Sequence, residues 1–250
     1  MNEILLTLDP ELLFYALILF FSYTIEAITG FGSTVIAVSL LSTVYSLQEI
    51  LPVIVPMSLV LSTGISYKNR RDIQIKLLKR KLLPLLFIGL LIGMLCFYFI
   101  SADVLKMQFA IFIIILSSLK LPEVMGLYEN KKPMKTYLSN IGIILAGVIH
   151  GLFASGGPLL VYVLGAFGLK KSEFRATLSM VWLSLNILMT VYYISRNMIH
   201  LEHLYKIGIL LFIIPLAYYF GNRFHQVISE KIFYLVIYVL LIVVGFMIIL

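Results

Sequence analysis

Charged side chains are scarce in this sequence. Asp, Glu, Lys and Arg make up 12% of the 250 residues, whereas apolar residues make up 61%, and the mean hydropathy is +1.05. A soluble domain usually has about 25% charged residues, because its surface must stay hydrated. This composition excludes an ordinary soluble protein. Long apolar runs recur over the whole length, so we expect a single membrane domain over 1–250, in the cell membrane.

Features typical of enzymes and metalloproteins are also missing. The one cysteine, Cys96, excludes an intrachain disulfide and a CxxC redox or metal pair, and we interpret it as a small hydrophobic side chain. No P-loop, HExxH or GxSxG motif occurs. We therefore expect no enzymatic activity, no metal and no cofactor. Residues 1–11 contain no Lys or Arg, which argues against a cleaved signal peptide.

Ten apolar segments follow one another along the chain. They are Leu12–Ile28, Thr34–Leu47, Ile50–Tyr67, Leu82–Ile100, Val104–Leu119, Tyr137–Ala154, Leu159–Leu169, Leu178–Ile194, Leu204–Phe220 and Ile232–Leu250. A helix needs roughly 20 residues to cross the apolar core of a bilayer. Six segments are close to that length, whereas Thr34–Leu47 is marginal and Leu159–Leu169 is far too short.

Each short segment follows a break that contains glycine. The breaks are Gly30-Phe31-Gly32-Ser33 in the first half and Ser155-Gly156-Gly157-Pro158 in the second. Taken as one piece, Leu12–Leu47 would be a helix of roughly 54 Å, which is much too long for one crossing. We therefore predict, in each half, two half-length helices that meet at a glycine turn inside the membrane.

The distribution of Lys and Arg among the loops tests whether each broken segment crosses the membrane once or returns to its own side as a hairpin. The loop Lys68–Lys81 carries seven Lys and Arg residues, so we place it on the cytoplasmic side. If each broken segment crosses once, 13 Lys and Arg residues lie in cytoplasmic loops and six lie outside. If each returns to its own side as a hairpin, 16 lie inside and three outside. We therefore predict hairpins, with Lys170–Arg175 also cytoplasmic and the acidic start of the chain outside.

The two halves of the chain resemble each other in hydropathy and in the positions of their breaks. The matched positions are Gly32 with Gly157, Ser58 with Trp182, Ser62 with Asn186 and Ser66 with Thr190. We predict one repeat over about 12–121 and another over about 137–250, each with a hairpin and three transmembrane helices. Three crossings invert the second repeat relative to the first. Inverted repeats with broken helices recur in secondary transporters, where the substrate binds near the membrane midplane.

The predicted hairpin tips are candidate anion sites. A helix that begins inside the membrane presents unpaired N–H groups and the positive end of its dipole, and glycine lets a ligand approach the backbone. Hydroxyl groups at the tips can donate further hydrogen bonds, and Pro158 suits a first helical position. The predicted substrate-binding residues are Gly30, Gly32, Ser33, Thr34, Ser155, Gly156, Gly157, Pro158 and Asn186. The alternative is that these glycines only allow close helix packing.

Two ionisable residues precede the breaks. Glu26 lies about one turn before the first break and His150 about one turn before the second. An ionisable group inside the membrane is costly and is therefore a candidate for function. Together they are candidates for proton coupling, because histidine titrates near neutral pH. The alternatives are a protonated Glu26 bonded to a backbone carbonyl and a neutral His150 satisfied by a serine.

Polar residues form two stripes on the predicted helices. One consists of Ser58, Ser62 and Ser66, and the other of Ser179, Asn186 and Thr190. Such stripes serve either hydrogen bonds between packed helices or a hydrated path through the protein.

Small residues also recur at helical spacing. Gly89-x-x-x-Gly93 and Gly147-x-x-x-Gly151 suit close contacts between helices. These contacts would lie either within one protomer or between the two protomers of a homodimer, and the pattern leaves both arrangements open.

The order of these features resembles that of the sulfite exporter TauE/SafE family over nearly the whole chain. The resemblance rests on the two breaks, the proline-containing helix Leu51–Ser66, the basic stretch Lys68–Asp72 and the run Arg175–Thr177 leading to Asn186. Phe31 stands where many members have another glycine, so we expect a bulkier first tip. The resemblance implies transport of sulfite, sulfonates or related sulfur anions, and sometimes of other small organic anions, without fixing the substrate.

These observations together predict a secondary transporter that moves a small anion, such as a sulfur-containing oxyanion or an organosulfonate, across the cell membrane. An anion or proton channel would use the same pore without alternating access, and a membrane enzyme or scaffold is the remaining class. The expected partners are the anion and the lipid bilayer. The net charge of +7 is explained by basic cytoplasmic loops, so we expect no nucleic-acid binding.

Overall fold

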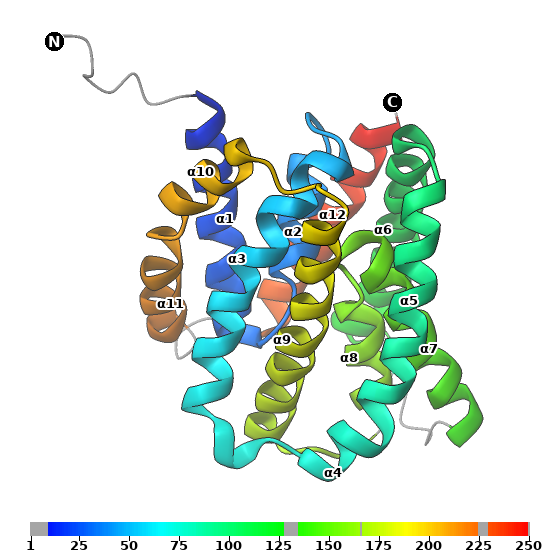
Figure 1. Cartoon of the computed structure of the whole chain (residues 1–250). Helices are drawn as coiled ribbons and strands as arrows, with labels where there is room; N and C mark the ends of the chain where they lie inside the picture. The colour runs from blue at the N-terminus through cyan, green and yellow to red at the C-terminus, as the bar shows by residue number, and fades with distance from the viewer. Residues whose placement is uncertain (1–9, 128–134, 166, 225–229, 250) are drawn as a thin grey trace, which may run out of the picture.

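The computed structural model describes residues 10–127, 135–165, 167–224 and 230–249. Every regular element in these ranges is helical, which confirms the prediction of an all-α protein. The main helices are α1 (Pro10–Thr29), α2 (Ser33–Leu41), α3 (Leu47–Lys68), α4 (Ile75–Leu77), α5 (Leu83–Phe99), α6 (Ala102–Met125), α7 (Thr136–Phe153), α8 (Gly157–Gly165), α9 (Lys171–Ser195), α10 (Leu201–Leu210), α11 (Ile213–Phe224) and α12 (Glu230–Ile249). They form one bundle, in which α1 begins and α12 ends at the same end (Figure 1).

Several of these helices are long and apolar enough to cross a membrane. Within the described ranges there are six such stretches, Pro10–Thr29, Leu47–Lys68, Ile75–Phe99, Ala102–Met125, Thr136–Phe153 and Ser172–Ser195. The pair α10 and α11 makes a seventh if it is one span. The protein is therefore a multi-pass membrane protein, as the composition predicted.

The pair α10 and α11 is bent by 40°. The sequence did not predict this bend inside Leu204–Phe220. Pro215 supplies the physical reason, because proline has no N–H to donate to the carbonyl of Leu211 and its ring crowds that carbonyl. The continuous helical hydrogen bonding of α10 therefore ends at Leu211, and α11 begins two residues later.

Both predicted glycine breaks are present, one between α1 and α2 and the other between α7 and α8. α2 and α8 have nine residues each and are half-length as predicted, but the prediction was wrong for α1 (20 residues) and α7 (18 residues), which are long enough to cross a membrane. α2 packs back against α1, and α8 packs back against α7, so each pair forms a helical hairpin. In Figure 1, α1 and α2 reach the middle of the bundle from the end at which α1 begins, whereas α7 and α8 reach it from the opposite end. The two tips therefore approach each other inside the bundle.

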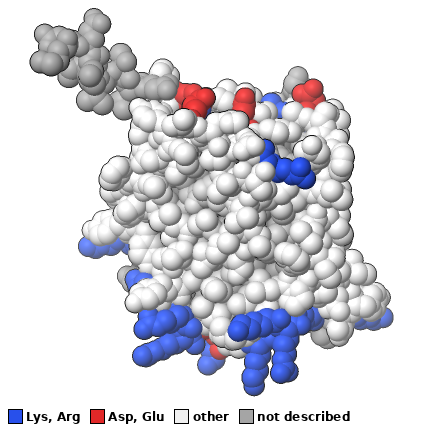
Figure 2. Space-filling model, viewed as in Figure 1, with Lys and Arg blue, Asp and Glu red and all other residues white. Residues whose placement is uncertain are grey.

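Charge is separated along the bundle axis. In Figure 2, Lys and Arg side chains gather at the lower end, whereas the acidic side chains visible in this view lie mostly at the upper end. The basic end contains the segment between α3 and α5, with a 3-10 turn at Arg70–Asp72 and a π-helix at Leu78–Leu82. Between the ends lies a wide band with few charges, which is the surface expected to face lipid.

The tightest helix contact in this bundle joins α5 to α7. A Cβ atom added at Gly89 would overlap the carbonyl oxygen of Ile144, and one added at Gly147 would overlap that of Leu86. Gly93 and Gly151 meet one turn further along. The two glycine pairs predicted from the sequence therefore pack against each other within one chain, which decides between the two arrangements that the sequence left open.

Candidate functional site

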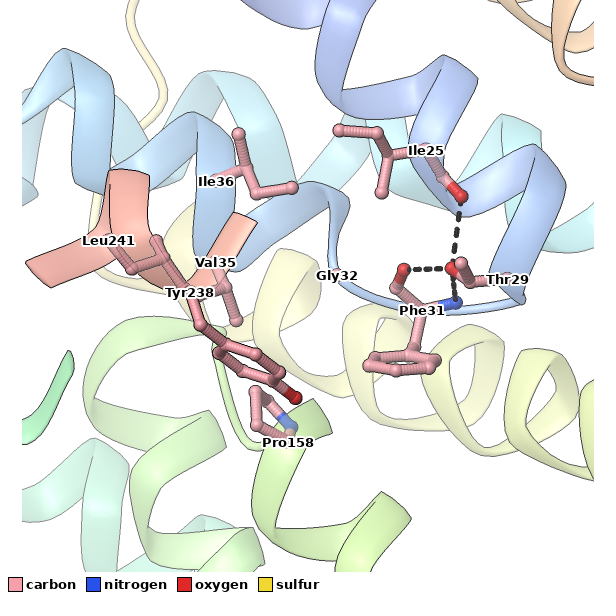
Figure 3. A pocket seen from close by; sticks show the side chains of 9 residues that line it. All are labelled: Ile25, Thr29, Phe31, Gly32, Val35, Ile36, Pro158, Tyr238 and Leu241. Carbon is pink, nitrogen blue, oxygen red and sulfur yellow. Dashed lines mark hydrogen bonds between the residues drawn. The ribbon is translucent and has the colours of Figure 1, made fainter. Parts of the chain in front are cut away.

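The tip of the first hairpin is built on glycines with left-handed backbone. Gly30 has φ +85° and Gly32 has φ +98°, a region that side chains rarely allow. Between them, the Thr29 hydroxyl donates to the carbonyl oxygen of Phe31 at 2.6 Å and accepts from the Phe31 N–H at 3.2 Å, as Figure 3 shows. This local network turns the chain so that α2 starts immediately after Gly32.

Arg175 of α9 holds the end of α1. Its Nη2 donates to the carbonyl oxygen of Ala27 at 2.6 Å, which satisfies one of the last carbonyls of that helix. A Cβ atom at Gly30 would lie 2.7 Å from the Cγ atom of Arg175. Gly30 is thus needed both for its backbone conformation and for the approach of α9. The sequence analysis placed Arg175 in a loop. Its contact with α1 could not be predicted, because no local sequence pattern distinguishes an arginine in a loop from one that caps a distant helix.

The tip of the second hairpin is held by packing. The Ser155 hydroxyl donates to the carbonyl oxygen of Phe153 at 2.8 Å. A Cβ atom at Gly156 would overlap the carbonyl oxygen of Ala146 in α7. Ala154 rather than a glycine takes the left-handed conformation here, with φ 51°. Ser155 and Gly156 therefore shape the tip.

The two tips meet at Gly157 and Phe31. A Cβ atom at Gly157 would lie 3.7 Å from the Cζ2 atom of Trp182 and 3.8–3.9 Å from two atoms of Phe31. These are ordinary contact distances, so Gly157 borders free space and not the backbone of another helix. Phe31, which the sequence marked as a bulky departure at the first tip, is thus the side chain that reaches the second tip.

An apolar pocket lies on one side of this meeting point (Figure 3). Its lining residues are Ile25, Thr29, Phe31, Gly32, Val35, Ile36, Pro158, Tyr238 and Leu241. In Figure 3, the ring of Tyr238 from α12 lies beside Pro158 of α8. None of these described lining residues is charged, so Pro158 contributes to apolar contact between the two hairpin tips here.

A polar cavity lies on the other side of the meeting point. Its lining residues are Glu26, Gly32, Thr34, Ser58, His150, Ala154, Gly157, Trp182 and Asn186. They come from both hairpins and from α3 and α9, so both halves of the chain build it. The cavity is tight, with free space on the order of one water molecule. Its lining groups must move apart to admit a larger ligand.

The ionisable side chains of the cavity are paired with neutral groups. Glu26 is 4% exposed and accepts a hydrogen bond from the Ser33 hydroxyl. His150 is 2% exposed, and its Nε2 atom lies 3.0 Å from Oδ1 of Asn186. Because an amide oxygen only accepts, Nε2 carries the proton of this bond. The Trp182 ring stacks on the His150 ring, with centroids 5.3 Å apart and planes 20° apart.

Several hydroxyl groups near the cavity lack partners. Ser62 and Ser66 of α3, and Ser179 and Thr190 of α9, have buried hydroxyl oxygens without a hydrogen-bond partner. α3 and α9 pack along each other, so the two polar stripes predicted from the sequence share one interface. Because buried polar groups are normally satisfied by protein or water, this interface is suited to bound water.

The predicted site residues fall into two groups. Gly32, Thr34, Gly157, Asn186, Glu26 and His150 line the polar cavity. The remainder support it: Ser33 bonds Glu26, Gly30 faces Arg175, Ser155 and Gly156 shape the second tip, and Pro158 lines the apolar pocket. The sequence analysis did not assign Ser58 or Trp182 to the site. Two signals could have found them: the repeat alignment paired these two residues, and the first polar stripe contained Ser58.

Helical hairpins that enter a bundle from opposite ends and enclose a buried polar cavity define the class of integral membrane transporters. The comparison with known families agrees. Residues 15–248 match the sulfite exporter TauE/SafE family, and the chain belongs to that family. Its members are membrane transporters of sulfur anions and not enzymes. No curated protein and no solved structure matches the chain.

Proposed function

We propose that this protein is a secondary transporter of a small sulfur-containing oxyanion or organosulfonate, and that the polar cavity between the hairpin tips is its substrate site. The observation that carries this proposal is the meeting of the two tips, at Gly157 and Phe31, beside a buried cavity with polar walls. Family membership supports the substrate class. The individual sulfur anion is left for the transport assay below.

The tips supply the physical basis for anion binding. α2 and α8 each begin at the cavity, so their first N–H groups and the positive ends of their dipoles lie beside it. Backbone N–H groups of residues 32–34, 156, 157 and 159 would bind the anion, helped by the hydroxyl of Thr34 and by Asn186. The hydroxyls of Ser33 and Ser155 already donate to Glu26 and to the Phe153 carbonyl, and we propose that they hold the tips in place for the anion. In surroundings of low polarity each such hydrogen bond is strengthened. Two dipoles then offset the loss of hydration without a Lys or Arg among the described cavity-lining residues.

Alternating access fits the architecture. We place the basic end, with Lys68–Lys81 and Lys170–Arg175, in the cytoplasm, because cytoplasmic loops are enriched in Lys and Arg. The hairpins then enter from opposite faces, and three crossings follow each, so the halves would be inverted repeats. In such transporters one repeat rocks against the other around a fixed site. The tightness of the cavity supports a closed intermediate of this cycle.

Glu26 and His150 are the groups proposed to couple transport to protons. Both line the cavity, one from each hairpin. A proton taken up by either side chain would therefore change its electrostatic interaction with the bound anion. Their hydrogen-bond partners, Ser33 and Asn186, are neutral, whereas the guanidinium charge of Arg175 also acts on Glu26. The structural alternative is that both stay neutral and only hold the tips.

Flux through proteoliposomes tests the proposed function. Purified protein would be offered sulfite, sulfate, thiosulfate, sulfoacetate, taurine and simple carboxylates, with empty liposomes as the control. We expect saturable uptake of at least one sulfur anion and exchange against the same anion on the other side. Flux that does not saturate and shows no counter-transport would assign the protein to the channels instead. Transport of carboxylates alone would contradict the proposed substrate class.

A further inference from the structure

Trp182 is the single tryptophan of the chain and lies in the wall of the polar cavity. It is 6% exposed. One edge of its indole faces Gly157, because a Cβ atom added there would lie 3.7 Å from Cζ2. Its face stacks on His150. The indole therefore packs on two residues of the second hairpin that line the same cavity.

The indole N–H finds no hydrogen-bond partner among the residues that the structure describes. Nε1 of Trp182 is buried, and so is Nδ1 of His150, the nitrogen that does not face Asn186. An unsatisfied buried donor costs about 1–3 kcal/mol, and buried tryptophans usually find a partner. The buried N–H of Trp182, in the wall of a polar cavity, points to a ligand that supplies the missing acceptor, whereas Nδ1 of His150 is an acceptor when the proton is on Nε2.

We propose that Trp182 binds the transported anion directly, with its indole N–H donating to an oxygen of that anion. This inference rests on the proposed function and adds a specificity-determining residue to its site. An indole N–H only donates, so it favours a ligand with acceptor oxygens on its surface, such as a sulfite or sulfonate group. A cationic or purely donor ligand would leave this N–H unsatisfied.

The stacked ring gives this donor a fixed direction. His150 lies parallel to the indole and is itself held by Asn186, so the orientation of the N–H is set before the ligand arrives. A donor that is already oriented loses little conformational entropy on binding.

Replacement of one atom tests the proposal. Because the chain has one tryptophan, growth with 3-benzothienylalanine changes a single side chain and replaces its N–H by sulfur at nearly the same shape. We expect the Kd of the transported anion, measured by isothermal titration, to rise about 10- to 100-fold, the effect of losing one hydrogen bond to a charged group. Trp182→Phe should give a loss at least as large. The emission of Trp182 in the parent should change on binding.

Tyr193→Phe is the matched control. Tyr193 lies on the same helix, is fully buried, has a hydroxyl without a partner and does not line the cavity. Its variant should bind with the parent Kd. If the protein with 3-benzothienylalanine at position 182 has the melting temperature and the Kd of the parent, the proposed role of Trp182 is wrong. The proposed function would then still stand. A parent protein that binds none of the sulfur anions would instead overturn the proposed function, and with it this inference.

Discussion

The four glycines at the hairpin tips differ in what surrounds them. Gly30 and Gly32 have left-handed backbone, and Gly30 also faces Arg175. Gly156 packs against the backbone of α7, whereas Gly157 borders the cavity at ordinary contact distances. A substitution at Gly30, Gly32 or Gly156 therefore tests the stability of the fold. A substitution at Gly157 tests the proposed binding site.

Gly157→Ala should fill the cavity without disturbing the hairpin. The added methyl group meets no atom closer than 3.7 Å, but the free space is on the order of one water molecule, so a ligand would lose its place. We expect the Kd of the transported anion to rise tenfold or more, equivalent to at least about 1.4 kcal/mol, with an unchanged melting temperature. Isothermal titration measures the Kd, and a thermal-shift assay measures the melting temperature. An unchanged Kd would move the binding site away from the tips.

Gly156→Ala is the companion variant. Its methyl group would overlap the Ala146 carbonyl oxygen, so we expect a lower melting temperature before any effect on binding can be read. Equal stability of the two alanine variants would contradict the assignment of Gly156 to packing and of Gly157 to the cavity.

Glu26→Gln separates proton coupling from binding. Glutamine can still accept the hydrogen bond of Ser33, but it cannot take up a proton. We expect the dependence of flux on the pH gradient to disappear, while the affinity for the anion changes little. Proteoliposome flux with and without an imposed gradient measures this. Equal pH dependence in variant and parent would leave Glu26 a structural carboxyl group.

At the scale of the helices, the glycine faces of α5 and α7 determine how closely these elements approach. Their backbones touch at Gly89, Gly93, Gly147 and Gly151, so dispersion contacts between main-chain atoms stabilise the pair. α7 carries His150 into the cavity and connects to the second tip. The position of α7 against α5 therefore also sets the depth of that tip.

Gly147→Ala should destabilise the protein. A methyl group there overlaps the Leu86 carbonyl oxygen and forces the helices apart, which we expect to cost about 1–3 kcal/mol and to lower the melting temperature in detergent. Gly64→Ala on α3 is the control, because its added Cβ atom meets nothing within 4 Å. The control should be neutral or slightly stabilising, since alanine favours helix. Equal melting temperatures for the two variants would contradict the packing described here.

At the scale of the whole molecule, the separation of charge predicts orientation in the membrane. Single cysteines would replace Lys76, Lys170 or Glu202 in a variant that carries Cys96→Ala. Intact cells with each variant would then be treated with a membrane-impermeant maleimide. We expect labelling of position 202 only, because Lys206 and Glu202 form an ion pair near the start of α1, at the end opposite the basic loops. Labelling of position 170 from outside would replace the second hairpin by a single crossing.

Hydropathy and glycine placement, read along the chain, were sufficient for the class of protein, the two breaks and the presence of glycine faces for close helix packing. The family resemblance needed, in addition, the proline-containing helix, the basic stretch and the run Arg175–Thr177. These features are local: a helix must be about 20 residues long to cross a bilayer, and a glycine turn is visible wherever it occurs. The same patterns also singled out Glu26, His150, Gly32, Gly157 and Asn186, which the structure brings together around one polar cavity.

The tertiary structure alone decided what each of these residues touches. Arg175 holds the end of α1 across 148 residues of sequence, and Trp182 stacks on His150 from another helix. Neither contact follows from spacing, because it depends on the rotation and depth of helices that pack far from one another in sequence. The tertiary structure also decided that Gly156 serves helix packing and that Gly157 borders the cavity. The sequence cannot distinguish these two roles, because they depend on whether another helix or free space lies beside the glycine.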